Sequence, residues 1–202
     1  MIARLYSIQK GKILINSNNL NDLAINDWYK NISVLFQDFN TYISLSAEEN
    51  IAMGRPILGI DHDKVIAAAK QADAHKFISQ YKHGYEQLLS ERYKGGIRPS
   101  TGQWQKIALA RMFYRDPPLL IFDEPTATID AISEYRIFNL IYKFFKNKTV
   151  IIVSHRFSTV RNADRIIVLS KGRITEQGSH SELMEKNGTY AKMFRLQAKG
   201  YQ

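Results

Sequence analysis

The stretch Pro118-Leu119-Leu120-Ile121-Phe122-Asp123-Glu124 decides the fold class. Its apolar run is continuous, which is typical of a strand buried on both faces of a parallel sheet. Two adjacent carboxylates, Asp123 and Glu124, end the run, and open parallel sheets bind ligands at the carboxyl ends of their strands. Neighbouring negative charges in a partly dry site are costly unless a cation compensates them. The stretch therefore predicts either a metal-binding catalytic edge or a strand that ends in a capped acidic turn.

The segments around this stretch alternate between strands and helices. Short apolar runs predict strands at 12–15, 31–36, 118–122, 149–153 and 165–169, and Lys171-Gly172 predicts a hairpin turn into 173–176. Helical spacing predicts helices at 61–80, 102–114, 133–145, 157–162, 181–186 and 189–198, with a loop at 93–99. This alternation indicates an α/β fold with a mainly parallel sheet flanked by helices.

Composition excludes several classes of protein. The chain has 202 residues, of which 45% are hydrophobic and 23% charged, and this is too apolar for a disordered tail. No apolar run approaches the length needed to cross a bilayer, and the first residues hold no secretory signal. Without cysteine there is no disulfide framework or thiolate site. The net charge of +9 is dispersed along the chain, which favours a solvated surface over a nucleic-acid footprint.

Three further polar positions follow a strand or begin a helix. His155 comes just after the strand 149–153, so it lies beside Asp123 if the two strands are neighbours, where it would donate to a phosphate oxygen. Gln37 follows the strand 31–36 and is a candidate to orient water or bind Mg²⁺. Ser100 precedes a helix whose N-terminus is suited to phosphate, although serine there often serves as an N-cap alone.

Together these pieces resemble the nucleotide-binding domain of an ATP-binding cassette (ABC) protein. The order Gln37, Ser100-Thr101-Gly102-Gln103, Asp123-Glu124, Asp130 and His155 matches the family's Q-loop, signature, Walker B, D-loop and H-switch. The resemblance runs from Ile2 to Gln202 and is strongest to exporter ATPases. It implies a P-loop NTPase-like fold, in which 1–37 and 116–202 form a RecA-like core and 38–115 an inserted helical subdomain that carries the signature.

The resemblance implies ATP and Mg²⁺ as cofactors and a role for each motif residue. The implied catalytic residues are Glu124, His155 and Gln37, the metal ligands are Asp123 and Gln37, and the nucleotide contacts are Ser100, Gly102, Gln103 and Asp130. The implied partners are the transmembrane domain of an exporter and a second ATP-binding domain, identical or different, with no nucleic acid. The implied location is the cytoplasmic face of the plasma membrane.

The sequence departs from the family pattern at two places. It contains no G-x-x-x-x-G-K-[ST] loop, and residues 2–6 resemble the helix that follows this loop in the family. We therefore expect the N-terminal strands and the phosphate loop to be missing, with a gap in the central sheet. We also expect that the chain alone neither hydrolyses ATP nor folds stably. In the signature, Thr101 replaces a glycine, and its branched side chain is expected to weaken one ATP site.

Three interpretations remain open at this point. The first is the carboxyl-terminal part of an exporter ATPase domain, which couples ATP binding and hydrolysis to transport. The second is a non-catalytic, truncated gene product. The third is a soluble ABC protein that acts on nucleic acid, which the net charge of +9 favours only slightly because no basic arm is present.

Overall fold

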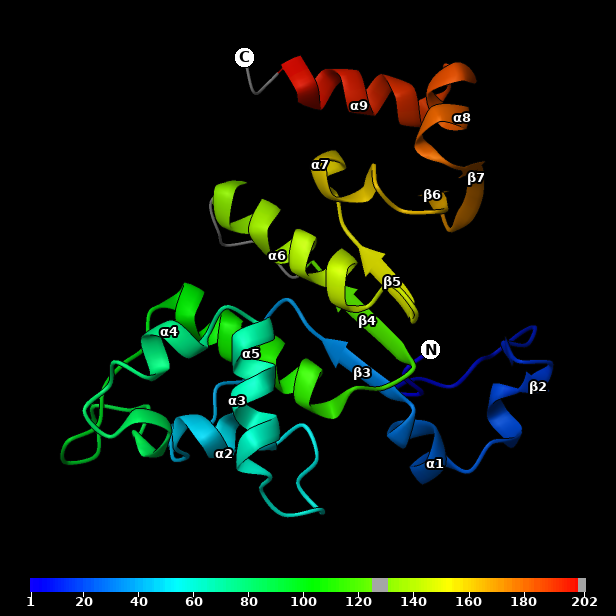
Figure 1. Ribbon diagram of the computed structural model, residues 1–202. Helices are drawn as coiled ribbons and strands as arrows, with labels where there is room; N and C mark the ends of the chain where they lie inside the picture. Colours follow the sequence, from blue (N-terminus) through cyan, green and yellow to red (C-terminus); the bar gives the residue numbers. More distant parts are fainter. Residues whose placement is uncertain (125–130, 200–202) are drawn as a thin grey trace. The chain divides into compact units, whose positions relative to one another are not determined.

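The computed structural model describes residues 1–124 and 131–199, and the chain divides into two compact units, Met1–Ile151 and Ile152–Gln202. Strands β3 (Ile32–Leu35), β4 (Leu119–Asp123) and β5 (Thr149–Val153) form a sheet in the order β3-β4-β5 (Figure 1). β3 and β4 are parallel, with Leu35 opposite Phe122. The predicted α/β fold with a parallel sheet is confirmed.

Helices of the first unit pack on one another beside this sheet. The unit contains β1 (Leu14–Ile15), β2 (Asn18–Asn19), η1 (Leu20–Asp22), α1 (Ile25–Lys30), α2 (Ala47–Ala52), α3 (His62–Gln71), α4 (His75–Ile78), η2 (Gly84–Glu86), α5 (Thr101–Arg115) and α6 (Ala131–Phe144). α2, α3 and α5 contact one another (Figure 1). Behind the sheet, Phe113 stacks on Phe145 with ring centroids 4.6 Å apart, and Phe122 is fully buried. These aromatic contacts join α5, the end of α6 and β4 in one core.

The bounds of α5 follow from local chemistry at both ends. Ser100 forms a capping box with Gln103, which satisfies free N–H groups of the first turn. At the other end Asp116 adopts a left-handed backbone with φ 52°. Pro117 and Pro118 follow and cannot continue the helix, so the chain turns from α5 directly into β4.

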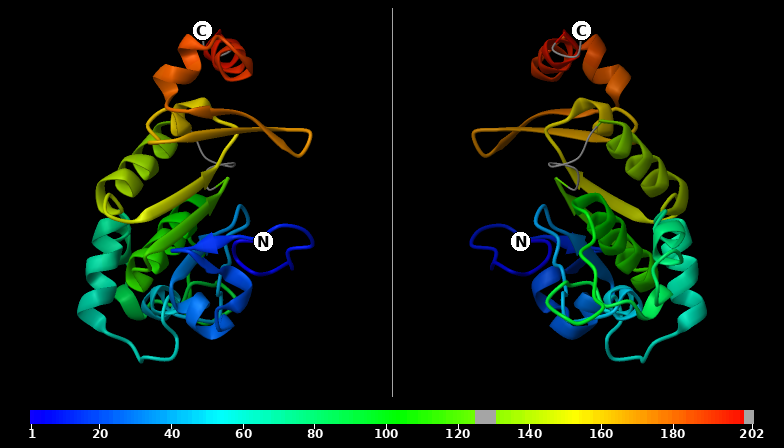
Figure 2. Two further views of the ribbon diagram at one scale, coloured as in Figure 1. Left: turned by 90° about the vertical axis from the view of Figure 1, so that its right-hand side faces the viewer. Right: turned by 90° about the vertical axis from the view of Figure 1, so that its left-hand side faces the viewer.

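The second unit begins within β5 and is built around a hairpin. It contains α7 (Phe157–Val160), β6 (Ile166–Ser170), β7 (Arg173–Gly178), α8 (His180–Glu185) and α9 (Thr189–Lys199). β6 and β7 are antiparallel, and Figure 2 shows them as an extended ribbon. The turn between them has positive φ at Lys171 (49°) and Gly172 (73°), the backbone of a type I′ turn. The hairpin predicted at Lys171-Gly172 is confirmed.

Three predicted elements differ from those observed. Only Leu14–Ile15 of 12–15 is a strand, and it pairs with Asn18–Asn19 in a small hairpin rather than with the central sheet. The helix predicted at 61–80 is interrupted by Asp73, whose φ of 55° ends α3 before α4 begins. Residues 2–6, helical by resemblance, form turns instead. Such a short segment cannot nucleate a helix by itself, and the Ile2 carbonyl accepts a hydrogen bond from Trp28 Nε1 at 3.0 Å.

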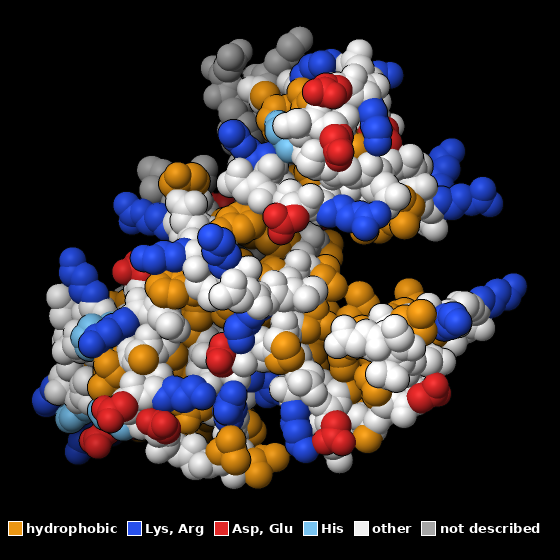
Figure 3. Space-filling model, turned by 45° about the vertical axis from the view of Figure 1, so that its right-hand side comes forward, with side chains coloured by type: hydrophobic (Ala, Val, Ile, Leu, Met, Phe, Trp, Pro, Cys, Tyr) orange, Lys and Arg blue, Asp and Glu red, His pale blue; other side chains and the backbone are white. Residues whose placement is uncertain are grey.

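Surface charge is mixed in sign. On the face shown in Figure 3, Lys and Arg side chains are interspersed with Asp and Glu side chains rather than gathered in one patch. Within residues 1–124 and 131–199, no helix has both the length and the apolar character needed to cross a bilayer.

Candidate functional site

Gln37 and the pair Asp123-Glu124 lie at the same edge of the sheet. β3 and β4 are parallel, and Leu35 is paired with Phe122. Gln37 comes two residues after Leu35, and Glu124 comes two residues after Phe122. Neighbouring strands are about 4.8 Å apart, so this register brings the backbone at Gln37 near the backbone at Asp123 and Glu124. Asp123 and Glu124 are half-buried, and Gln37 is exposed. The backbone thus supports the predicted grouping of Gln37 with the two acids.

Glu124 has an unusual backbone conformation. Its φ is 44°, in the left-handed region, which costs about 1–2 kcal/mol for a residue with a Cβ atom. Asp73 and Asp116 have the same backbone conformation at helix ends, and Lys171 has it in a hairpin turn. The positive φ of Glu124 therefore describes how the chain leaves β4 and does not by itself identify a functional residue.

His155 follows β5, the strand that lies next to β4 in the sheet order. Its loop is held by α9: Gln197 Nε2 donates to the His155 carbonyl at 3.3 Å, and Gln197 Oε1 accepts from the Phe157 N–H at 2.7 Å. The His155 side chain is exposed. Asp130, the remaining predicted contact from this part of the chain, lies outside the described residues.

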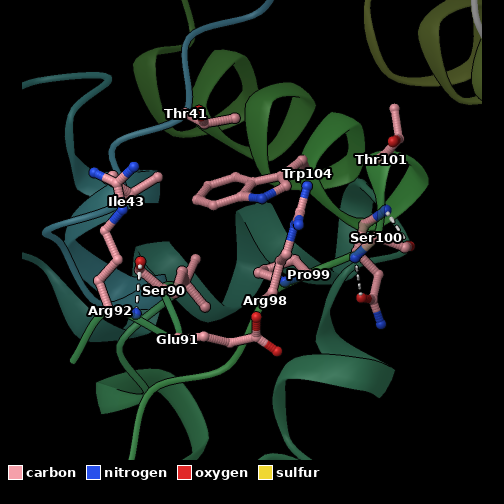
Figure 4. A pocket seen from close by; sticks show the side chains of 12 residues that line it. Thr41, Ile43, Ser90, Glu91, Arg92, Arg98, Pro99, Ser100, Thr101 and Trp104 are labelled. Carbon is pink, nitrogen blue, oxygen red and sulfur yellow. Dashed lines mark hydrogen bonds between the residues drawn. The ribbon is translucent and has the colours of Figure 1, made fainter. Parts of the chain in front are cut away.

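Ser100 is the N-cap of α5, and Gln103 lies in the first turn. Figure 4 shows Ser100 at this helix end. The Gln103 N–H donates to Ser100 Oγ at 3.3 Å, and the Ser100 N–H donates to Gln103 Oε1 at 2.9 Å. The cap uses Ser100 Oγ as an acceptor, so its O–H remains a donor that suits an anion. A Cβ atom built on Gly102 would meet nothing within 4 Å, so the helix end is open at Gly102. The 15 residues of α5 add a positive dipole end at this point.

A cavity of about 900 Å³ opens beside this helix end. Its walls are Thr41, Ile43, Leu89, Ser90, Glu91, Arg92, Arg98, Pro99, Ser100, Thr101, Gln103 and Trp104. Figure 4 shows the indole of Trp104 extending from α5 toward the segment of Thr41 and Ile43. Trp104, Arg92 and the 41–43 wall were not predicted from the sequence. A weak signal for Arg92 was its place directly before the loop at 93–99, which contains a second arginine, Arg98.

The predicted residues of the first unit thus fall into two groups. One is the sheet edge with Gln37, Asp123 and Glu124, and the other is the α5 terminus with Ser100, Gly102 and Gln103. The cavity walls include Ser100 and Gln103 but none of the sheet-edge residues.

The sheet edge has donor atoms that suit Mg²⁺. The Asp123 carboxylate and the Gln37 amide offer the oxygen ligands this ion prefers. Across the described parts of the chain, no three His, Cys, Asp or Glu side chains gather into a metal site. Magnesium commonly keeps water and phosphate oxygens in its shell, so two protein ligands are sufficient at a nucleotide site.

Comparisons with known proteins identify the family of the chain. The family model for ABC transporters matches residues 1–127. The chain is 44% identical over 199 residues to the leukotoxin export ATP-binding protein LtxB of Aggregatibacter actinomycetemcomitans, covering 98% of this chain and 27% of LtxB. It is 42% identical over 200 residues to the alpha-hemolysin translocation ATP-binding protein HlyB of Escherichia coli, with the same coverage of each chain.

A solved structure supports the same assignment at the level of the fold. A bacterial Atm1-family ABC exporter with ATP bound superimposes with a TM-score of 0.86 at 34% identity, over 98% of this chain and 33% of that chain. The chain therefore spans about a third or less of each of these relatives. With the family model matching well over half of its residues, the chain belongs to the ABC transporter family.

Proposed function

We propose that this chain is part of the ATP-binding domain of an ABC exporter and helps couple ATP binding and hydrolysis to transport across a membrane. The observation that carries the proposal is the shared sheet edge. Gln37 and Glu124 each come two residues after the paired residues Leu35 and Phe122 of the parallel strands β3 and β4. The names of the relatives describe ATP-binding proteins of export systems, which supports the same function.

The residues of the sheet edge divide the chemistry between them. Asp123 and Gln37 would hold Mg²⁺, which when bound neutralises charge on the transferred phosphoryl group. Glu124 would accept a proton from the attacking water, and Gln37 would help to orient that water. His155 would donate a hydrogen bond to a phosphate oxygen.

The α5 terminus would act on nucleotide held by a second ATP-binding domain. Ser100 supplies an O–H donor, and Gly102 allows close approach of the backbone because it has no side chain. Thr101, exposed at the cavity, is expected to weaken this contact. Asp130 and Gln103 are the other two proposed nucleotide contacts. The partners would be this second domain and a transmembrane domain, at the cytoplasmic face of the plasma membrane.

The division of the domain is also part of the proposal. Residues 1–37 and 116–202 would form the RecA-like core, and 38–115 the helical subdomain. In support, α2, α3 and α5 of the segment 38–115 contact one another, while β3 and β4, which flank this segment, pair with each other.

The 202 residues contain no G-x-x-x-x-G-K-[ST] loop, so the backbone nest and the lysine that grip β- and γ-phosphates in the family are not among them. The α5 terminus would still present Ser100 to a partner's nucleotide.

Measurement of ATP turnover tests the proposed function. The protein is assayed with its transmembrane partner in membranes, and the 202-residue chain is assayed alone. Turnover that couples to export in the assembly, with none from the isolated chain, is the expected result. An assembly that neither hydrolyses ATP nor exports would contradict the proposed function.

A further inference from the structure

The segment that follows Gln37 is held in place by one buried side chain. Asn50, fully buried on α2, donates from Nδ2 to the carbonyls of Tyr42 at 2.9 Å and Leu45 at 3.2 Å. Its Oδ1 accepts from the Tyr42 N–H at 3.3 Å. Residues 38–45 have no helix or strand of their own, so these contacts determine the course of their backbone.

Arg111 connects the same segment to α5. Its Nε donates to the Asn50 carbonyl at 2.9 Å, and one terminal nitrogen donates to the Asn40 carbonyl at 3.2 Å. The other terminal nitrogen reaches Asn50 Oδ1 at 3.4 Å. The guanidinium also lies over the ring of Tyr42, 4.6 Å from its centroid. From the third turn of α5, Arg111 therefore contacts both Asn50 and the segment that Asn50 holds, at Asn40 and Tyr42.

The chemistry of this contact requires an arginine. Burial lowers the pKa of Arg111, and the contacts described above are all to neutral groups. A buried cation is costly, and here the planar fork of the guanidinium offsets that cost by donating to several acceptors at fixed angles. A lysine would keep the charge but not the geometry. The contact is therefore specific for one relative position of α5 and the segment 38–46.

A similar contact holds the strand before Gln37. Arg115, one turn further along α5, donates from Nε to the Ile32 carbonyl at 2.9 Å and from a terminal nitrogen to the Gly54 carbonyl at 2.8 Å. α5 is thus attached to the chain both before and after Gln37, while its own N-terminus carries Ser100.

We infer that Arg111 and Asn50 are positioning residues that fix the segment 38–46 to α5 and thereby set the course of the backbone that leaves Gln37. The inference rests on the proposed function, in which Gln37 and Ser100 contact nucleotide. Neither Arg111 nor Asn50 borders the 900 Å³ cavity, so they act through the backbone that they hold.

Amide hydrogen exchange of the full chain tests the physical contact without any nucleotide. Arg111→Lys is expected to raise exchange of residues 40–46 by about tenfold while residues 62–71 of α3 change little. Lys106→Gln, on the same helix, is the matched control, because it removes only the exposed ion pair to Asp73 at 2.5 Å. Equal acceleration of exchange in both segments would show that Arg111 stabilises the fold in general rather than this segment. Unchanged exchange of residues 40–46 would show that Arg111 does not hold them. Either result would overturn the inference.

Kinetics of the assembled transporter test the positioning role. Arg111→Lys and the milder Tyr42→Leu, which removes the cation–π contact, are expected to lower kcat for ATP several-fold with little change in KM. A rise in KM alone, or the same kcat loss in Lys106→Gln, would overturn the inference. If the wild-type assembly shows no turnover, the proposed function fails, and the exchange experiment still decides whether 38–46 is fixed to α5.

Discussion

Ser100 and Gln103 cap each other at the start of α5, through hydrogen bonds of 3.3 Å from Gln103 N–H to Ser100 Oγ and 2.9 Å from Ser100 N–H to Gln103 Oε1. The serine of the signature therefore has two separable properties. Its oxygen lone pairs stabilise the helix terminus, and its hydroxyl proton remains for a ligand.

Substitutions at Ser100 are expected to separate these properties. Ser100→Ala loses both, so the free energy of unfolding should fall by about 1 kcal/mol and nucleotide turnover should fall as well. Ser100→Asp keeps the cap and should retain stability, but it lacks the donor and repels phosphate. Urea denaturation and turnover of the assembly measure the two effects. Equal stability of the alanine and aspartate variants would contradict the capping role.

Gly102 and Gly54 are expected to respond to alanine in opposite directions. A Cβ atom at Gly102 meets nothing within 4 Å, so Gly102→Ala should stabilise α5 by about 0.5–1 kcal/mol while reducing turnover, because it obstructs close approach of phosphate. At Gly54 a Cβ atom would lie 2.4 Å from the Arg111 carbonyl oxygen. Gly54→Ala should therefore destabilise the chain by about 1–3 kcal/mol.

Thermal or urea unfolding of both glycine variants checks this pair. A stabilised Gly102→Ala variant with full turnover in the assembly would argue against a ligand at the α5 terminus. A Gly54→Ala variant as stable as wild type would contradict the close contact between Gly54 and α5.

The stability of the helical region is expected to depend on pH through His62. The hydrogen bond from His62 Nδ1 to Glu48, 2.6 Å long, raises the pKa of His62, and the charges of Glu48, Asp63 and Glu86 act in the same direction. Because the folded pKa exceeds the unfolded value of about 6.5, this stabilisation is complete below that value and is lost as pH rises through the folded pKa.

Urea denaturation between pH 5.5 and 8.5 measures the effect. Wild type should exceed His62→Gln in stability at the acidic end, and the difference should vanish at the alkaline end. Glu48→Gln should likewise be less stable than wild type at the acidic end and equally stable at the alkaline end. A difference that is constant with pH would indicate that packing of His62, rather than its charge, is responsible.

Much of the fold and of the sheet edge was predictable from the sequence because the signals are local. The continuous apolar run 119–122 predicts β4, and the acids directly after it predict the edge site. Ser100, three residues before Gln103, predicts the start of α5. Each of these features depends on residues close together in the chain, where periodicity and capping rules apply.

The remaining features depend on contacts between distant residues. Arg111 and Asn50 are 61 residues apart, and neither residue type is unusual in a helix. The cavity takes its walls from 41–43, 89–92 and 98–104, which only the packing of α5 brings together. The break at Asp73 was also hidden, because the apolar spacing continues across it to Phe77. Tertiary contacts override local propensity at such positions.

Nucleotide binding and turnover, measured side by side in the assembled transporter, show whether the β3–β4 edge is catalytic. Glu124→Gln should retain ATP binding but lose turnover by about 100-fold or more, because the general base is gone. Asp123→Asn should lose the dependence of binding on Mg²⁺. Wild-type turnover in both variants would contradict the assignment of the β3–β4 edge as the catalytic site.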